Sequence, residues 1–157
     1  MKVFRLSKQK FANDLSGSGA ELTGGRWNKI GTKLLYTSDS RALCTAEIAV
    51  HTPIGVIPND YYLITIEIPD SIEILNLDTS SLPDDWTSFP HSEITQIVGE
   101  NFILKREFLI MKVPSAVVQG DYNYLINPSH QDFDKIKIIN KEKFTFDERI
   151  FKYKHGG

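Results

Sequence analysis

The sequence predicts a compact α+β protein that forms a single domain over residues 1–157. Three observations support this fold class: a length of 157 residues that suits one domain, several short segments rich in β-branched and aromatic residues, and two longer segments with helical spacing of apolar residues. Neither an internal repeat nor a linker divides the chain. We therefore expect short strands in a central sheet with flanking helices.

The chain begins with a predicted strand at Val3–Leu6, followed by a helical turn or an irregular segment over Lys8–Leu15. The small residues of Ser16–Gly19 predict a flexible loop. Lys33–Thr37 follows a turn at Gly31 and is the next predicted strand.

Arg41–His51 is the clearest helix in the sequence. Three polar residues before it, Ser38-Asp39-Ser40, offer side chains that can cap its N-terminus. Pro53 lies just beyond its end, where a proline disfavours further helix.

The middle of the chain carries two predicted strands, one helix and one long loop. Tyr61–Ile68 is rich in aromatic and β-branched residues, and Ile72–Leu77 is expected to form another strand. Asp78–His91 contains several aspartates and prolines and predicts a loop long enough to be functional or mobile. Ser92–Lys105 has near-helical apolar spacing, although Gly99 lowers its helix propensity.

The C-terminal part is expected to consist of strands. Phe108–Val113 is strongly apolar, and Pro114-Ser115 interrupts it. Four further short strands are predicted after this break: Ala116–Val118, Tyr124–Ile126, Lys135–Ile139 and Phe144–Phe146.

Composition narrows the classes of function. The chain is 41% hydrophobic and 24% charged, with a formal net charge of −2, so nucleic acid is not an expected direct partner. A single cysteine, Cys44, excludes an intrachain disulfide and suits a reducing cytoplasm. No apolar run is long enough to span a membrane, and the N-terminus has no signal-peptide pattern. We expect a cytoplasmic protein.

The stretch Gly24-Gly25-Arg26-Trp27-Asn28 combines flexible, charged, aromatic and polar residues within five positions. Two glycines permit a sharp turn and close approach to a ligand, and Arg26 offers a charged fork suited to phosphate or carboxylate. The alternative is a structural Gly-Gly hairpin with an arginine at its rim. From the spacing alone, both interpretations remain open.

Glu47 is the most informative carboxylate, because apolar residues flank it on the predicted helix. Glutamate is rarely buried without a partner, so two explanations compete. Glu47 is either a structural partner of a core arginine or a carboxylate that faces a pocket and serves chemistry there.

Tyr36 and Ser115 are the other candidates. Tyr36 is either a strand aromatic or a stacking face and hydroxyl donor beside a planar ligand. Ser115 either bonds local backbone or presents its hydroxyl to a cleft. No histidine is placed to activate it, which argues against a serine hydrolase, and the scattered His and Cys residues predict no metal site. Phosphate-loop and dinucleotide-fold glycine motifs are absent.

Several separated motifs, in this order, resemble the RES domain family. They are Gly24–Gly31, Tyr36–Ser38, Ala46–His51, Val113–Val118, Asn123–His130 and Phe146–Ile150. The arginine, glutamate and serine that give the family its name match Arg26, Glu47 and Ser115. Gln131 departs from the pattern where the family has a proline, which affects only local turn geometry.

The resemblance implies a fold similar to that of ADP-ribosyltransferases. It also implies a bacterial toxin that depletes NAD and is inhibited by a partner antitoxin with an Xre-like helix-turn-helix part. NAD would be the substrate, and no cofactor is expected. The acceptor of the ADP-ribosyl group stays open: water, phosphate or a protein side chain. A non-catalytic nucleotide-binding module and, less favoured by the acidic charge balance, a toxin acting on RNA are the alternatives.

The resemblance also implies roles for individual residues. Arg26 would hold the NAD pyrophosphate, and Tyr36 would pack near the nicotinamide or its ribose. Glu47 would stabilise the cationic sugar that develops as the nicotinamide bond breaks. Ser115 would orient the ribose or nicotinamide, and Asn127 would support the site.

Overall fold

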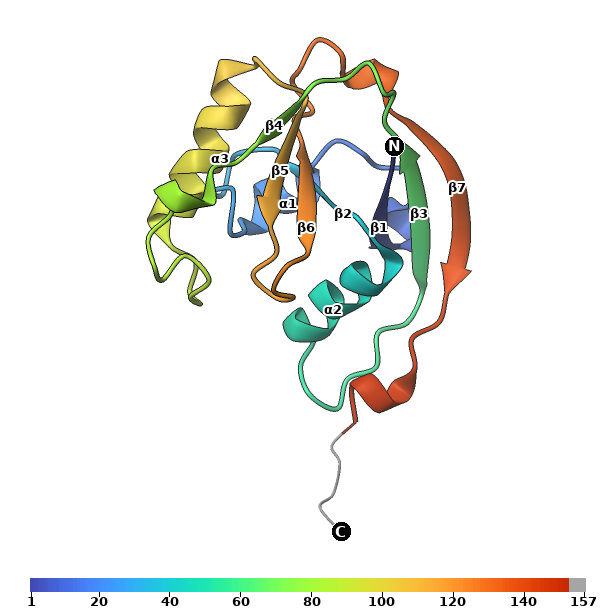
Figure 1. Ribbon diagram of the computed structural model, residues 1–157. Helices are drawn as coiled ribbons and strands as arrows, with labels where there is room; N and C mark the ends of the chain where they lie inside the picture. Colours follow the sequence, from blue (N-terminus) through green and yellow to red (C-terminus); the bar gives the residue numbers. More distant parts are fainter. Residues whose placement is uncertain (153–157) are drawn as a thin grey trace.

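The computed structural model describes residues 1–152 and is built around one mixed sheet (Figure 1). Seven strands lie in the order β4-β5-β6-β2-β1-β3-β7, and all neighbours are antiparallel except β4 and β5. The strands are β1 (Lys2–Lys8), β2 (Leu35–Ser38), β3 (Tyr61–Glu67), β4 (Ile74–Asn76), β5 (Ile110–Pro114), β6 (Tyr122–Ile126) and β7 (Lys137–Phe144). The three α-helices are α1 (Ser18–Thr23), α2 (Arg41–His51) and α3 (Glu93–Lys105).

The helices lie around the sheet, and this confirms the expected α+β class. Figure 1 shows α3 outside β4, β5 and β6, and α2 near the ends of β1 and β2. Ser40 caps α2 by accepting a hydrogen bond from the Leu43 amide at 3.0 Å, and Ser92 caps α3 in the same way through Ile94. Both helices therefore begin where the polar residues of the sequence predict.

Buried residues form three groups that hold these layers together. One group lies on the sheet, and its members include Val3, Leu35, Ile64 and Ile126. A second group joins α3 to β5 and β6, and a third joins α2 to β1 and β3. Burial of apolar area at these interfaces is the main stabilising contribution.

Three local predictions were wrong. Ser18 and Gly19 begin α1 instead of lying in a loop, after Gly17 adopts a φ of 75° that suits glycine. Ala116–Val118 forms bends, because the Ser115 hydroxyl accepts hydrogen bonds from the Val117 and Val118 amides and so turns the backbone.

The third correction concerns the C-terminal strands. Lys135–Ile139 and Phe144–Phe146 do not form two strands, since one long strand, β7, spans most of this region. Its middle, which includes Asn140 and Glu142, is polar and has no apolar alternation. Among residues 1–152, β7 pairs with β3 alone and is an edge strand, where charged side chains are common. Within residues 1–152, no helix is long and apolar enough to cross a membrane.

Candidate functional site

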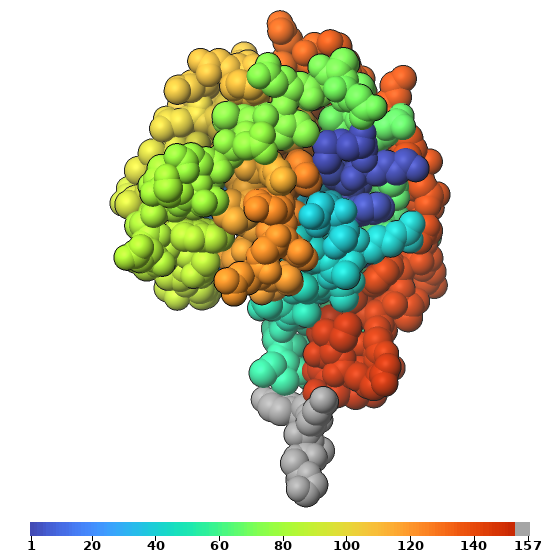
Figure 2. Space-filling model, in the orientation of Figure 1, coloured from blue at the N-terminus to red at the C-terminus, as the bar shows by residue number. Residues whose placement is uncertain are grey.

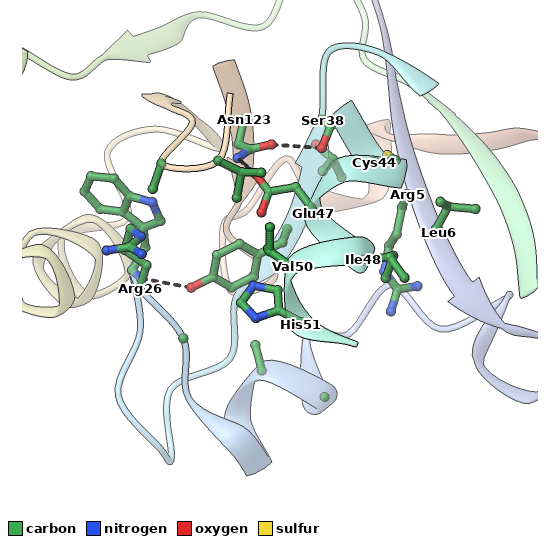
Figure 3. A pocket seen from close by; sticks show the side chains of 18 of the residues that line it. Arg5, Leu6, Arg26, Ser38, Cys44, Glu47, Ile48, Val50, His51 and Asn123 are labelled. Carbon is green, nitrogen blue, oxygen red and sulfur yellow. Dashed lines mark hydrogen bonds between the residues drawn. The ribbon is translucent and has the colours of Figure 1, made fainter. Parts of the chain in front are cut away.

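A cleft of about 940 Å³ lies where the glycine-rich turn, β2 and α2 meet. Its size is at the upper end of the range of small-molecule sites. Arg26, Tyr36 and Glu47 all line it, although they come from three different elements. Figure 3 shows Glu47 directed from α2 into the cleft and Arg26 on the opposite wall. The structure thus brings together the three residues on which the sequence prediction rests.

Glu47 is half-buried and makes two hydrogen bonds through the same oxygen. Its Oε1 accepts from Asn123 Nδ2 at 2.8 Å and from the Ser115 hydroxyl at 3.2 Å. No arginine lies within salt-bridge distance of it among residues 1–152, so the interpretation of a core arginine pair is wrong. Its second oxygen, Oε2, makes no hydrogen bond to the described part of the chain, which leaves it free for a ligand.

Arg26 is tied to the loop of residues 78–91. Its Nη1 donates to the carbonyl oxygens of Trp86 at 2.6 Å and Ser88 at 3.0 Å. A guanidinium carries five N–H donors, and within residues 1–152 Arg26 uses only those of Nη1. Burial lowers the pKa of Arg26 from its ordinary value, and the charge of Glu47 partly offsets that effect, yet arginine stays charged at neutral pH. A cation with free donors therefore faces Glu47 across the cleft.

The loop of residues 78–91 forms part of the cleft wall. Trp86 packs against the buried Trp27 with ring centroids 6.1 Å apart, and Phe89 and His91 line the cleft. Burial, together with the charges of Arg26 and His51, lowers the pKa of His91 and favours the neutral imidazole. Figure 2 shows this loop in yellow-green at the margin of the visible face. Its backbone holds Arg26 in place.

Tyr36 contributes its ring to the cleft, while its hydroxyl holds the glycine-rich turn. The hydroxyl donates to Asn28 Oδ1 at 2.7 Å and accepts from the Trp27 amide at 3.0 Å. Burial raises the pKa of this phenol, so it stays protonated. A Cβ on Gly25 would lie 2.7 Å from the Tyr36 hydroxyl oxygen, which explains the glycine. The hydroxyl is engaged, so only the ring face is available to a planar ligand.

Asn28 is fully buried and closes the same turn. Its Nδ2 donates to the carbonyl oxygens of Ala20 and Thr32 at 2.8 and 3.1 Å, which joins α1 to the turn. Gln96 of α3 donates to the Gly25 carbonyl at 3.0 Å. The stretch Gly24–Asn28 is therefore a hydrogen-bonded turn, as the structural interpretation expected, and it also forms a wall of the cleft. Its contact with a ligand stays a prediction.

Ser115 is buried behind Glu47, and its hydroxyl both donates and accepts hydrogen bonds within the protein. Its oxygen accepts from the amides of Val117 at 3.1 Å and Val118 at 3.0 Å, and its proton points to Glu47. Ser115 is not among the residues that line the cleft. The geometry assigns it to holding Glu47, in place of the expected contact with ribose or nicotinamide.

Asn127 lies outside the cleft. It is fully buried, its Nδ2 donates to the Ile103 carbonyl at the end of α3, and its Oδ1 accepts from the Ser129 amide at 2.9 Å. These bonds hold the turn after β6 against α3. We therefore correct its expected role in ligand binding to a structural one.

Sequence reasoning missed several cleft residues, foremost Arg5, Ser38 and Asn123. Arg5 lies near Ile48 and Leu6, across α2 from Arg26, and its Nη1 donates to the Asp14 carbonyl at 3.1 Å. Ser38 and Asn123 face each other across β2 and β6. Ser38 and Asn123 both lie in the motifs that resemble the RES domain, and this was the signal in the sequence that could have identified them. Among residues 1–152, no three His, Cys, Asp or Glu side chains are grouped to hold a metal ion.

Comparison with known proteins adds a family to this geometry. The sequence matches the family model described as the RES domain over residues 2–147. It is 36% identical over 145 residues to a protein of Sphingobium sp. (strain YBL2) named Prs ADP-ribosylating toxin, with 90% of this chain and 89% of that protein covered.

A second relative is the protein named Toxin Res of Photorhabdus laumondii, which is 35% identical over 157 residues, with 98% of this chain and 99% of that protein covered. Among solved structures, a chain of the M. tuberculosis MbcT-MbcA toxin–antitoxin complex shares the fold, with a TM-score of 0.70 and 22% identity. The likeness covers 92% of this chain and 84% of that chain.

Proposed function

The chain belongs to the RES domain family, and on that premise we propose that it is the toxin of a toxin–antitoxin pair and cleaves the nicotinamide–ribose bond of NAD. The observation that carries this proposal is the single cleft in which Arg26 and Glu47 face each other beside the ring of Tyr36. The names of the relatives, Toxin Res and Prs ADP-ribosylating toxin, support a toxin that handles an ADP-ribosyl group.

The charges of the cleft suit the two ends of this reaction. The free N–H groups of Arg26 match the oxygens of a pyrophosphate, which a planar fork binds in a bidentate way. The ring of Tyr36 offers a face for the nicotinamide or its ribose. Glu47 then lies where the reacting sugar would be, on the far side of the cleft from Arg26.

Bond cleavage follows from this placement. The electron pair of the C1′–N1 bond leaves with the nicotinamide nitrogen, which becomes neutral, and the sugar becomes an oxocarbenium cation. The carboxylate of Glu47 stabilises that cation electrostatically, because it is already fixed before the charge develops. The leaving group needs no proton, so the site needs no general acid.

Three acceptors complete the reaction in different ways. Water gives ADP-ribose and releases a proton, phosphate gives a phosphorylated ADP-ribose, and a nucleophilic protein side chain becomes ADP-ribosylated. Hydrolysis or phosphorolysis, which deplete cytoplasmic NAD, is our leading reaction. The name of the Sphingobium relative favours transfer to a protein as the second candidate.

The experiment that tests the function is incubation of the purified protein with NAD, with and without phosphate and with a bacterial extract. Mass spectrometry of the products identifies the acceptor. Free nicotinamide above a heat-inactivated control supports the proposal. Tight binding of intact NAD without any product would instead support a non-catalytic binding module.

We expect Arg26→Lys to raise the KM for NAD about tenfold while kcat changes by only a few fold. Lysine keeps the charge but cannot hold the loop carbonyls and a pyrophosphate together, and the pyrophosphate charge is the same in ground and transition states. Initial-rate kinetics of nicotinamide release measure both constants. Arg41→Lys is the matched control, since Arg41 pairs with Glu142 at the surface outside the cleft. A tenfold loss confined to kcat would contradict the assignment.

The proposed partner is an antitoxin that blocks the cleft. The solved neighbour is a toxin–antitoxin complex, and we extend that pairing to this chain, with an adjacent gene for an Xre-like helix-turn-helix protein. Expression of this chain alone should stop growth and lower cellular NAD, and co-expression of the neighbour should restore both. Toxicity that persists with the neighbour present would show that the pairing is wrong.

A further inference from the structure

We propose that Asn123 and Ser38 are positioning residues that fix the carboxylate of Glu47 through a directed chain of hydrogen bonds. Asn123 Nδ2 donates to Glu47 Oε1 at 2.8 Å, and Ser38 Oγ lies 2.8 Å from Asn123 Oδ1 (Figure 3). This inference rests on the proposed function, because it concerns the residue that would stabilise the cationic sugar.

The direction of each bond in the chain follows from chemistry. A carboxylate only accepts hydrogen bonds, so the Asn123 amide must turn its NH₂ toward Glu47. Its carbonyl oxygen is then turned toward Ser38, and the hydroxyl of Ser38 has to donate. If the Ser38 hydroxyl is removed, the amide loses the contact that fixes this orientation.

The sheet holds this series of hydrogen bonds in a fixed position. Ser38 and Asn123 are directly paired residues of the antiparallel strands β2 and β6. On its other side Asn123 pairs with Val113 of β5, so it lies in an interior strand with neighbours on both sides. Ser38 is also buried, with 5% of its surface exposed, so its side chain is held by the surrounding protein. The position of Glu47 is therefore tied to the register of the sheet.

The hydrogen bonds from Asn123 and Ser115 determine which oxygen of Glu47 is available to a ligand. Both donors, Asn123 Nδ2 and the Ser115 hydroxyl, bond to Oε1. Two donors on one oxygen fix the carboxylate plane and leave Oε2 for the reacting sugar. A fixed charge acts in the transition state without the cost of reorganisation, so loss of this alignment lowers kcat, while NAD binding through Arg26 persists.

The expected result is a graded loss of turnover. Removal of a hydrogen bond to a charged group by Asn123→Ala should lower kcat about 10- to 100-fold, and Ser38→Ala should lower it about 3- to 10-fold. KM for NAD should stay within about twofold in both, because the pyrophosphate site is untouched. The matched control is Thr95→Val, which removes a buried hydroxyl of α3 outside the cleft lining; this hydroxyl donates to the carbonyl oxygen of Ser92, the N-cap of the helix. It should leave kcat unchanged.

A double-mutant cycle tests whether Ser38 acts on Glu47 through Asn123. Because Ser38 acts through Asn123, Ser38→Ala should have no further effect on kcat in the Asn123→Ala background. If Asn123→Ala does not fold, Ser38→Ala and Ser38→Thr carry the test, since threonine keeps the hydroxyl and should restore turnover. A role limited to stability would lower the melting temperature and leave kcat of the folded fraction intact.

The outcomes separate this inference from the function on which it rests. If wild type releases nicotinamide from NAD and both variants keep kcat within twofold, the positioning role is wrong and the proposed function stands. Additive losses in the double variant would also overturn it. If wild type releases no nicotinamide, both the function and the positioning role fall.

Discussion

Glu47→Gln should lower kcat for nicotinamide release by roughly 10²–10³-fold while the protein stays folded. Glutamine has nearly the same size, and its carbonyl oxygen can still accept from Asn123 and Ser115, so packing behind the cleft is kept. What is lost is the charge that faces the developing cation. Because that charge acts mainly in the transition state, KM for NAD should change little.

Melting temperature measured beside kcat makes this prediction decisive. Glu142→Gln, which removes a carboxylate that pairs with Arg41 at the surface, is the matched control and should keep full turnover. A folded Glu47→Gln protein with near-normal kcat would remove Glu47 from the reaction. A large fall in melting temperature with normal turnover would return Glu47 to a structural role.

Gly99→Ala should destabilise the protein by about 3 kcal/mol or more, because α3 packs closely on the backbone of the glycine-rich turn. A Cβ at this position of α3 would lie 1.7 Å from the Trp27 carbonyl oxygen and 2.7 Å from the Trp27 carbonyl carbon. Backbone atoms cannot yield as a flexible side chain can, so α3 would have to move off the glycine-rich turn. The hydrogen bond from Gln96 to Gly25 would be lost with it.

Thermal unfolding measures this effect, which for a chain of this size corresponds to a fall of about 6 °C or more. Gly19→Ala is the control for stability: nothing lies within 4 Å of its Cβ, and the position is helical, so the melting temperature should hold or rise slightly. A Gly99→Ala protein that melts like wild type would contradict the close packing of α3 on Trp27.

Local patterns predicted the elements with clear periodicity and caps. The helix at Arg41–His51 has the bounds that the sequence indicates, because a serine cap and a following proline mark its ends. Gly99 lowered the expectation of a helix at Ser92–Lys105, yet it is the residue that lets this helix approach Trp27. Helix propensity reflects the backbone entropy of glycine and the local chain alone. It does not include packing against Trp27, which is 72 residues away in the sequence.

The same limit applies to the site. The types and order of Arg26, Tyr36 and Glu47 indicated a ligand site, and the structure places them in one cleft. The network behind Glu47 was not visible in the sequence, because the pairing of Ser38 with Asn123 depends on strand order. Asn127 was assigned to the site by its motif, and its burial against Ile103 became apparent only in three dimensions.

NAD cleavage in this cleft is tested most directly by the rate at which the purified protein, freed of any antitoxin, releases labelled nicotinamide from NAD. Wild type, Glu47→Gln and a heat-inactivated sample are compared at equal folded concentration. We expect sustained release by wild type and a rate at least about 100-fold lower for Glu47→Gln. Release by wild type that does not exceed the heat-inactivated sample would contradict the claim that this cleft cleaves NAD.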